Sequence, residues 1–338
     1  MGEFLSSPIK DKDYEDGENS FIKFGASGMQ GWRKRMEDSY ICALNIGNNN
    51  QYDIFGVFDG HNGKEVSQFV KNHFIEELEN NINFKNNKIK EALTETFLKM
   101  DELMKTPEGK NELKEISKQS LLEDEEINKK TSNNFNNNSE MISNILGIKK
   151  YEEDIPKMTG TTACVCVIDE KNNKLYFANC GDSRAVLCKK NTAFPQSIDH
   201  KPDLPIEKNR IIKAKGWISM GRVKGNLNLS RSIGDFAYKE NSPDPNVQMI
   251  CPLPEINIEN LNNDCEFIVI GCDGIWDCLD NQEICNFVKK NIINKNKLSD
   301  GINEMLDNFL ANDIMNETGI GCDNMTCIVV ELKKSFVN

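Results

Sequence analysis

The sequence predicts an α+β fold in which antiparallel sheets pack on each other and helices cover their outer faces. Three short runs rich in Val, Cys and aromatic residues follow one another with short turns between them, over Thr161–Ile168, Leu175–Asn179 and Ala185–Cys188. Strands that arrive as neighbours in this way are typical of an antiparallel sheet. Strands and helices are grouped rather than strictly alternating along the chain, which favours packed sheets over a doubly wound fold.

The first 20 residues predict a flexible arm. They hold six acids and two lysines with little apolar content, and such termini are seldom ordered unless something ties them down. Met1-Gly2 with Ser6 fits the short pattern for N-myristoylation, with a plain N-terminus as the alternative. A single acyl chain gives only marginal membrane binding, so we expect membrane association only if Gly2 is acylated.

Ordered structure is predicted from Phe21 onward. Tyr52–Phe58 is a largely apolar and aromatic run, ended by Asp59-Gly60, that indicates a buried strand. The pattern then changes to helical spacing over Lys64–Leu78, and a second apolar stripe predicts a helix over Ile89–Leu103.

Residues 105–157 interrupt this pattern. They contain an acidic run at 123–126 and an Asn-rich tract at 133–138, a composition that buries too little apolar surface to offset the entropy of an ordered chain. We expect a mobile insertion with a short helix around Leu113–Ile127. A solvated spacer and a docking segment are both open interpretations of it.

Order is predicted to resume and continue to the end of the domain. Besides the three strands already described, the pattern indicates a strand over Glu266–Gly271, helices near 282–293 and 300–315, and a closing strand over Met325–Glu331. We therefore expect one domain over residues 21–333, interrupted by the insertion.

Composition excludes several classes of function. The chain has 338 residues with 53 acids against 41 Lys and Arg, a net charge of −12, so it has no basic stripe for binding nucleic acid. No apolar run approaches the ~20 residues that span a bilayer, and we expect a cytoplasmic protein, with the nucleus open as a second location. The 12 Cys form no Cys-x-x-Cys pair and there are only three His, so a bound metal would be a hard cation held by carboxylates.

Carboxylates recur at the ends of predicted strands. Asp59 and Asp273 each follow a buried strand and precede Gly, Asp182 follows the strand over Leu175–Asn179, and Asp323 precedes the closing strand. Each one taken singly fits a turn better than a ligand. If these ends meet at one rim, the like charges repel unless a cation neutralises them. The residues by themselves therefore indicate a hard-metal site without naming its reaction.

Longer strings extend this interpretation. They are GWRKRMED (31–38), VFDGHNG (57–63), GTTA (160–163), NCGDSR (179–184), HKP (200–202), LSRSIGD (229–235), CDGIWD (272–277) and GCDNMT (321–326). In this order they resemble the signatures of the PP2C (PPM) family of metal-dependent serine/threonine protein phosphatases. The resemblance covers about residues 21–332 apart from the insertion.

The resemblance implies a four-layer α/β/β/α sandwich with a binuclear Mn²⁺ or Mg²⁺ centre at one end. Its motifs assign metal-binding roles to eight positions. Asp59 is implied to bridge the two ions, and the Gly60 carbonyl to bind one of them. Asp273 and Asp323 are implied to bind the other ion. Glu37 and Asp38 are implied to act through bound water, and Asp182 and Asp277 to bind a third, weaker ion.

The implied reaction is hydrolysis of phosphoserine and phosphothreonine in proteins by a metal-bridged hydroxide, without a covalent intermediate. Arg33 is implied to grip the phosphate, and His61 to protonate the leaving alkoxide as general acid. Asn62 stands where the family usually has Gly, a change expected to reshape the mouth of the site without abolishing metal binding. Lys215 also replaces a usual Gly, in a segment that often tunes substrate choice, so it bears on substrate identity rather than on chemistry. A catalytically inactive scaffold of the same fold is the alternative, and a metal-dependent nuclease is disfavoured by the acidic charge.

Overall fold

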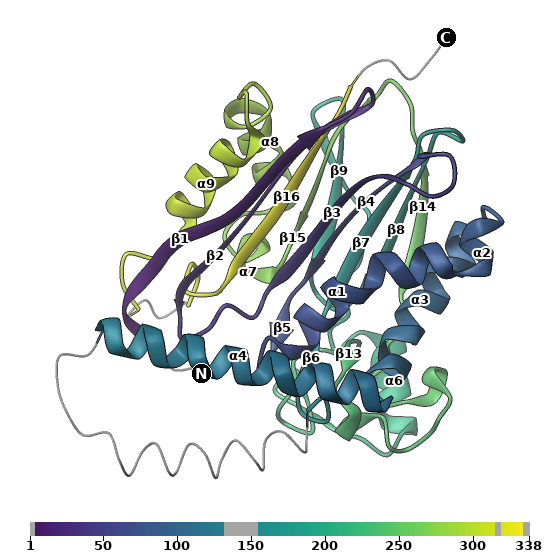
Figure 1. The fold of residues 1–338 in the computed structure, drawn as a ribbon, viewed down its shortest axis with the longest axis vertical. Helices are drawn as coiled ribbons and strands as arrows, with labels where there is room; N and C mark the ends of the chain where they lie inside the picture. The colour runs from purple at the N-terminus through teal and green to yellow at the C-terminus, as the bar shows by residue number, and fades with distance from the viewer. Residues whose placement is uncertain (1–3, 132–154, 315–318, 334–338) are drawn as a thin grey trace.

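The computed structural model describes residues 4–131, 155–314 and 319–333, with two antiparallel sheets packed face to face (Figure 1). The larger sheet has the strand order β1-β2-β16-β15-β9-β10. Its strands are β1 (Phe4–Glu18), β2 (Ile22–Arg33), β16 (Met325–Leu332), β15 (Cys265–Gly271), β9 (Arg184–Lys189) and β10 (Thr192–Pro195). Every neighbouring pair in it is antiparallel.

The second sheet has five strands in the order β14-β8-β7-β4-β3, again all antiparallel. They are β14 (Glu255–Asn260), β8 (Lys174–Cys180), β7 (Ala163–Asp169), β4 (Tyr52–Phe58) and β3 (Ser39–Ile46). The predicted β4 is confirmed residue for residue. The core between the sheets includes Phe24 and Phe55, whose ring centroids lie 5.2 Å apart.

Helices cover both outer faces (Figure 1). On the five-stranded sheet lie α1 (Glu65–Asn80), α2 (Ile82–Lys85) and α3 (Ile89–Leu103), and on the six-stranded sheet lie α8 (Asn281–Asn291) and α9 (Leu298–Phe309). In α9, Leu298, Ile302 and Met305 form the buried stripe that its spacing predicts. The predicted four-layer sandwich is thus confirmed.

Small elements gather at one end of the sandwich. A three-stranded sheet is formed by β5 (Gly60–His61), β6 (Gly160–Thr161) and β13 (Ile233–Gly234). The short helix α7 (Asp273–Trp276) follows β15 directly. Beside them are α6 (Pro205–Lys213), the hairpin β11 (Ile218–Ser219) and β12 (Arg222–Val223), and the 3₁₀ turns η1 (Phe236–Tyr238) and η2 (Pro245–Val247).

The prediction of a flexible arm over residues 1–20 is wrong for the part that the structure describes. Phe4–Glu18 forms β1, which pairs with β2 without a break over Lys12–Glu18 and also at Ile9 and Phe4, with register shifts between them. Asp16 accepts hydrogen bonds from the backbone N–H and hydroxyl of Ser299 at the start of α9. A strand at a sheet edge needs few apolar side chains, and charge on it is common, so composition alone misjudged this segment. Gly2 lies outside the described residues.

The prediction of a mobile insertion over 105–157 is also wrong for its first half. Residues Pro107–Thr131 form one helix, α4, longer than the short helix expected. Leu113 is buried, and the His73 ring of α1 lies 2.6 Å from the Glu112 carboxylate. A narrow apolar stripe is enough to dock a polar helix on a neighbour. The Asn-rich tract lies outside the described residues. Among those described, no helix has the length and apolar character needed to cross a bilayer.

Candidate metal centre

The predicted carboxylates converge at the end of the sandwich where the small elements lie. Asp59 follows β4 and Asp38 precedes β3, so both come from the five-stranded sheet. Asp273 opens α7 directly after β15 of the other sheet, and Asp182 sits in the turn between β8 and β9. Antiparallel pairing brings the end of one strand to the start of its neighbour, which is why residues far apart in sequence meet at this rim.

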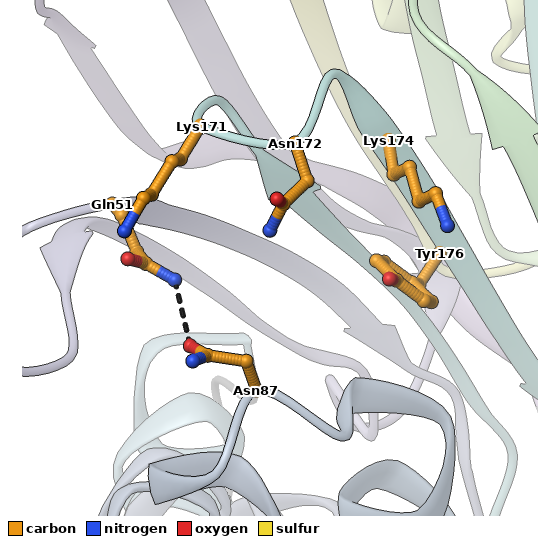
Figure 2. A pocket seen from close by; sticks show the side chains of 6 residues that line it. All are labelled: Gln51, Asn87, Lys171, Asn172, Lys174 and Tyr176. Carbon is orange, nitrogen blue, oxygen red and sulfur yellow. Dashed lines mark hydrogen bonds between the residues drawn. The ribbon is translucent and has the colours of Figure 1, made fainter.

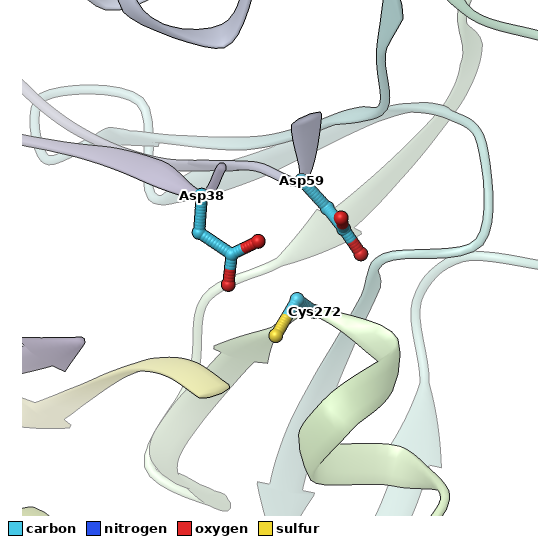
Figure 3. A group of neighbouring side chains, drawn as sticks. All are labelled: Asp38, Asp59 and Cys272. Atoms are coloured by element: carbon cyan, nitrogen blue, oxygen red, sulfur yellow. The ribbon is translucent and has the colours of Figure 1, made fainter. Parts of the chain in front are cut away.

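Two groups of ligand atoms form around Asp59. The first consists of Asp38, Asp59 and Cys272, and the second of Asp59, Asp182 and Asp273; within each group, ligand atoms lie within 4.8 Å of one another. Figure 3 shows the Asp38 and Asp59 side chains and that of Cys272 gathered in one space between their backbones. Asp59 belongs to both groups, so it is the residue that would be shared between two ions.

The electrostatics of the cluster call for a cation. Burial, and after it the carboxylates of Asp38 and Asp273, raise the pKa of Asp59 well above its ordinary value. Burial and the neighbouring Asp182 do the same to the pKa of Asp273, and burial raises the pKa of Asp38 to about 6. Such carboxylates destabilise one another when ionised, and a bound divalent cation reverses that penalty.

Hydroxyl and amide groups hold the central residue in place. The Asp59 backbone N–H donates to Thr162 Oγ1 over 3.1 Å, and the Thr162 N–H returns a bond to the Asp59 carbonyl over 2.9 Å. Thr162 Oγ1 lies 2.7 Å from Ser183 Oγ, next to Asp182. The turn after β4 is therefore fixed against the turn after β8, which keeps two of the carboxylates at a set separation.

The loop that carries Glu37 packs tightly on Gly60. A Cβ on Gly60 would lie 2.3 Å from the Glu37 carbonyl oxygen, so only glycine fits. The Glu37 backbone N–H donates to Asn324 Oδ1 over 2.9 Å. Burial raises the pKa of Glu37 to about 7, against the nearby charge of His61. Glu37 and Gly60 thus lie beside the cluster, while Glu37 is outside the two ligand groups.

Asp323 and Asp277 lie within electrostatic range of the cluster rather than in its ligand groups. Asp323 Oδ2 is 2.5 Å from Arg33 Nη2, so the two residues predicted to bind metal and phosphate contact each other. Burial raises the pKa of Asp277, with Asp182 and Asp323 adding to the effect against Lys201. Lys201 pairs directly with Asp182.

Three neighbours of the site were not assigned a role from the sequence. Cys272 contributes Sγ to a ligand group, Lys201 pairs with Asp182, and Asp235 Oδ2 lies 2.7 Å from His61 Nε2. All three occur inside the strings CDGIWD, HKP and LSRSIGD. Their position in those strings was the only indication in the sequence that they lie near the site. Their contacts depend on packing between distant segments, which the sequence does not show.

The donor set fits hard divalent cations. Mn²⁺ and Mg²⁺ prefer oxygen ligands, and clustered carboxylates without imidazoles provide them. Asp59, Asp182 and Asp273 supply such oxygens, and Asp38 adds a further carboxylate. The thiol of Cys272 is an unlike donor, and burial raises its pKa well above the ordinary range, so it suits packing better than ligation.

A separate pocket of about 440 Å³ lies at the other end of β4. Figure 2 shows its lining, in which Gln51 Nε2 donates to Asn87 Oδ1 over 3.0 Å. The lining residues are Gln51, Asn87, Lys171, Asn172, Lys174 and Tyr176. They include no carboxylate or imidazole, so this pocket has none of the groups expected for hydrolysis of a phosphate ester.

Comparison with known proteins decides the family. The family model for protein phosphatase 2C matches residues 22–118 and 108–318. "Probable protein phosphatase 2C 4" of Paramecium tetraurelia is 43% identical, with 98% of this chain and 99% of that protein covered. This chain belongs to the protein phosphatase 2C family.

Other members of the family align over almost the whole chain as well. "Probable protein phosphatase 2C 21" of Arabidopsis thaliana is 40% identical, with 99% of this chain and 93% of that protein covered. The crystal structure of a serine-threonine phosphatase 2C from Toxoplasma gondii matches with a TM-score of 0.69 at 16% identity, covering 98% of this chain and 100% of that one. That structural likeness shows the PP2C fold. The predicted resemblance is therefore confirmed, and the chain is a PP2C protein phosphatase.

Proposed function

We propose that this PP2C phosphatase hydrolyses phosphoserine and phosphothreonine in proteins with the help of two Mn²⁺ or Mg²⁺ ions. The observation that carries the proposal is the convergence of Asp59, Asp182 and Asp273, whose carboxylate oxygens lie within 4.8 Å of one another. A scaffold without activity would have no need to retain such a repulsive buried cluster.

Each carboxylate has a proposed position relative to the ions. Asp59 would bridge them with the Gly60 carbonyl beside it, and Asp273 and Asp323 would complete the protein ligands of one ion. Glu37 and Asp38 would orient bound water, while Asp182 and Asp277 would hold a weaker third ion. When bound, two such ions lower the pKa of a shared water and so supply a hydroxide nucleophile near neutral pH.

The other proposed groups act on the substrate. Arg33 presents a planar guanidinium that can donate to two phosphate oxygens, which orients the ester for in-line attack. His61 would give a proton to the departing seryl or threonyl oxygen, an effect typically worth about 10²–10⁴-fold in rate. Its raised pKa supports this role: burial lowers the pKa of His61, but the carboxylates of Asp235, Glu37 and Asp182 together raise it above its ordinary value.

The test is hydrolysis of a phosphothreonine peptide by the purified chain with Mn²⁺, with EDTA, and with the Asp59→Asn variant. We expect turnover with Mn²⁺ only, and a loss of at least about 10²-fold in kcat for the variant, because the site loses its shared ligand. Asp264→Asn, an exposed carboxylate paired with Lys190, is the matched control and should retain full turnover.

Two outcomes contradict the proposal. Turnover that persists in excess EDTA would exclude a metal-dependent reaction. Metal binding by calorimetry without turnover on any phosphopeptide would instead favour a binding module of the same fold.

A further inference from the structure

The small sheet at the site places His61 beside a carboxylate from a distant segment. In β13-β6-β5, Gly234 is paired with Gly160 and Gly160 with His61, so the three residues form one row across the strands. Asp235 is the next residue after Gly234. Its Oδ2 lies 2.7 Å from His61 Nε2, a contact between residues 174 positions apart in the sequence.

Asp235 is held rigidly. Its side chain is 1% exposed, and the Ser232 hydroxyl donates to the same Oδ2 over 2.5 Å. Its backbone N–H donates to the Thr159 carbonyl over 3.0 Å. The residue adopts a left-handed conformation with φ of 53°, which is uncommon outside glycine but tolerated by Asp. This backbone geometry turns the carboxylate back toward the strand that carries His61.

Gly160 leaves the space that this contact needs. A Cβ at that position would lie 2.2 Å from Asp235 Oδ2 and 2.6 Å from His61 Nε2. No side chain can occupy that volume while the hydrogen bond between the two residues remains. The contact therefore requires glycine at position 160. The reason is space rather than backbone conformation, because the φ of Gly160 is one that other residues also adopt.

A buried ion pair anchors the segment behind Asp235. Asp101 of α3 accepts a bond from the Gly234 backbone N–H over 2.8 Å and from Lys239 Nζ over 2.6 Å. Lys239 Nζ also donates to the Ser232 carbonyl over 2.9 Å. These bonds tie both sides of the Asp235 turn to a core helix, so the carboxylate cannot follow the His61 ring if the ring moves.

We propose that Asp235 is a positioning residue that holds the His61 imidazole by Nε2 and leaves Nδ1 to transfer the proton. Within the residues that the structure describes, Nδ1 has no hydrogen-bond partner. This inference rests on the proposed phosphatase reaction. The imidazolium gives its Nδ1 proton to the oxygen as the P–O bond breaks, and the Nε2–H bond to Asp235 persists throughout, so the ring ends neutral.

The kinetic test uses two substrates that differ in their leaving group. A phosphothreonine peptide releases a strongly basic alkoxide that needs a proton, whereas p-nitrophenyl phosphate releases a weak base that does not. For Asp235→Ala we expect kcat to fall by about 10²-fold with the peptide and by no more than about threefold with p-nitrophenyl phosphate, since only proton transfer is affected. KM should be unchanged for both.

Two further variants keep the test decisive. Gly160→Ala retains Asp235 but pushes it away from His61, and it should reproduce the selective loss. Asp264→Ala, far from the site and exposed, should turn over both substrates like the parent chain. Equal losses on the two substrates for Asp235→Ala and Gly160→Ala would overturn the proposal in favour of a structural role, as would full peptide turnover in either variant.

A proton NMR measurement tests the geometry independently of turnover. We expect a slowly exchanging, downfield His61 Nε2–H resonance that disappears in Asp235→Ala and in Gly160→Ala. The corresponding proton of His73, which lies 2.6 Å from Glu112, should persist as an internal reference. Persistence of the His61 resonance in Asp235→Ala would overturn the proposal. If the resonance behaves as expected but the parent chain hydrolyses no phosphopeptide, only the proposed function is contradicted.

Discussion

Arg33 Nη2 lies 2.5 Å from Asp323 Oδ2. The contact follows from the sheet, because β2 and β16 are antiparallel neighbours with Met29 paired to Met325. The end of one strand and the start of the other therefore meet at the rim where the carboxylates gather. The Arg33 Nε atom is buried without a hydrogen-bond partner in the described part of the chain, whereas 37% of the side chain is exposed, so a phosphate would meet the guanidinium at its exposed nitrogens.

Arg33→Lys should weaken the enzyme by removing the planar fork while keeping the charge. Loss of one charge-assisted hydrogen bond costs about 1.5–3 kcal/mol, so kcat/KM for a phosphothreonine peptide should fall by at least about tenfold. Steady-state kinetics measure this, with Arg222→Lys as the matched control, since within the described residues the Arg222 guanidinium donates only to the Asn226 carbonyl. Unchanged kcat/KM in Arg33→Lys would remove Arg33 from the phosphate site.

Metal binding should stabilise the fold. Asp273→Asn should separate this stabilisation from the charge repulsion that the carboxylates cause when no metal is bound. Without metal, the variant should melt at a higher temperature than the parent chain, because one of the mutually repelling carboxylates is gone. With Mn²⁺, the parent should gain about 2.7 kcal/mol at 100-fold excess over Kd, and the variant should gain less. Calorimetric melting with and without Mn²⁺ measures both shifts. A lower melting temperature of the metal-free variant would contradict the repulsion argument.

Glu170 should make stability depend on pH. Burial, and then the neighbouring Asp53, raise the pKa of Glu170 to about 8 from 4.5, and Asn19 Nδ2 donates to both carboxylates. The folded state therefore binds a proton that the unfolded state releases, so this contribution to stability is complete below pH 4.5 and is lost as pH rises through 8.

Glu170→Gln should remove that loss, because the amide stays neutral. Urea unfolding of both chains in saturating Mn²⁺ should show the variant gaining stability relative to the parent between pH 5 and pH 8. A difference in unfolding free energy that does not change with pH would show that Glu170 and Asp53 do not share a proton.

Helix α4 should contribute to stability through its buried stripe. Leu113 is 1% exposed, so Leu113→Ala should cost about 2–5 kcal/mol of unfolding free energy. Leu122→Ala on the same helix is the matched control, because that side chain is 62% exposed and should change stability by no more than about 0.5 kcal/mol. Equal, small effects in chemical denaturation would instead support the mobile insertion that the composition predicts.

The strand and helix pattern was predictable where apolar periodicity is strong. Tyr52–Phe58 and Ile89–Leu103 have the bounds that the sequence indicates, because the strand is an apolar run that is buried throughout and the helix buries one apolar stripe. Phe4–Glu18 and Pro107–Thr131 were misjudged for the opposite reason. Their order depends on pairing and docking partners elsewhere in the chain, which local composition does not describe.

The sequence by itself determined the family, through ordered strings, and the candidate carboxylates, through their places at strand ends. The tertiary structure decided which of them meet: Asp59 with Asp38, Asp182 and Asp273 in ligand groups, and Asp323 with Arg33. Only the tertiary structure shows that Asp235 contacts His61. Spacing along a chain specifies which side chains leave a strand end, whereas distances between strand ends depend on how two sheets pair and pack.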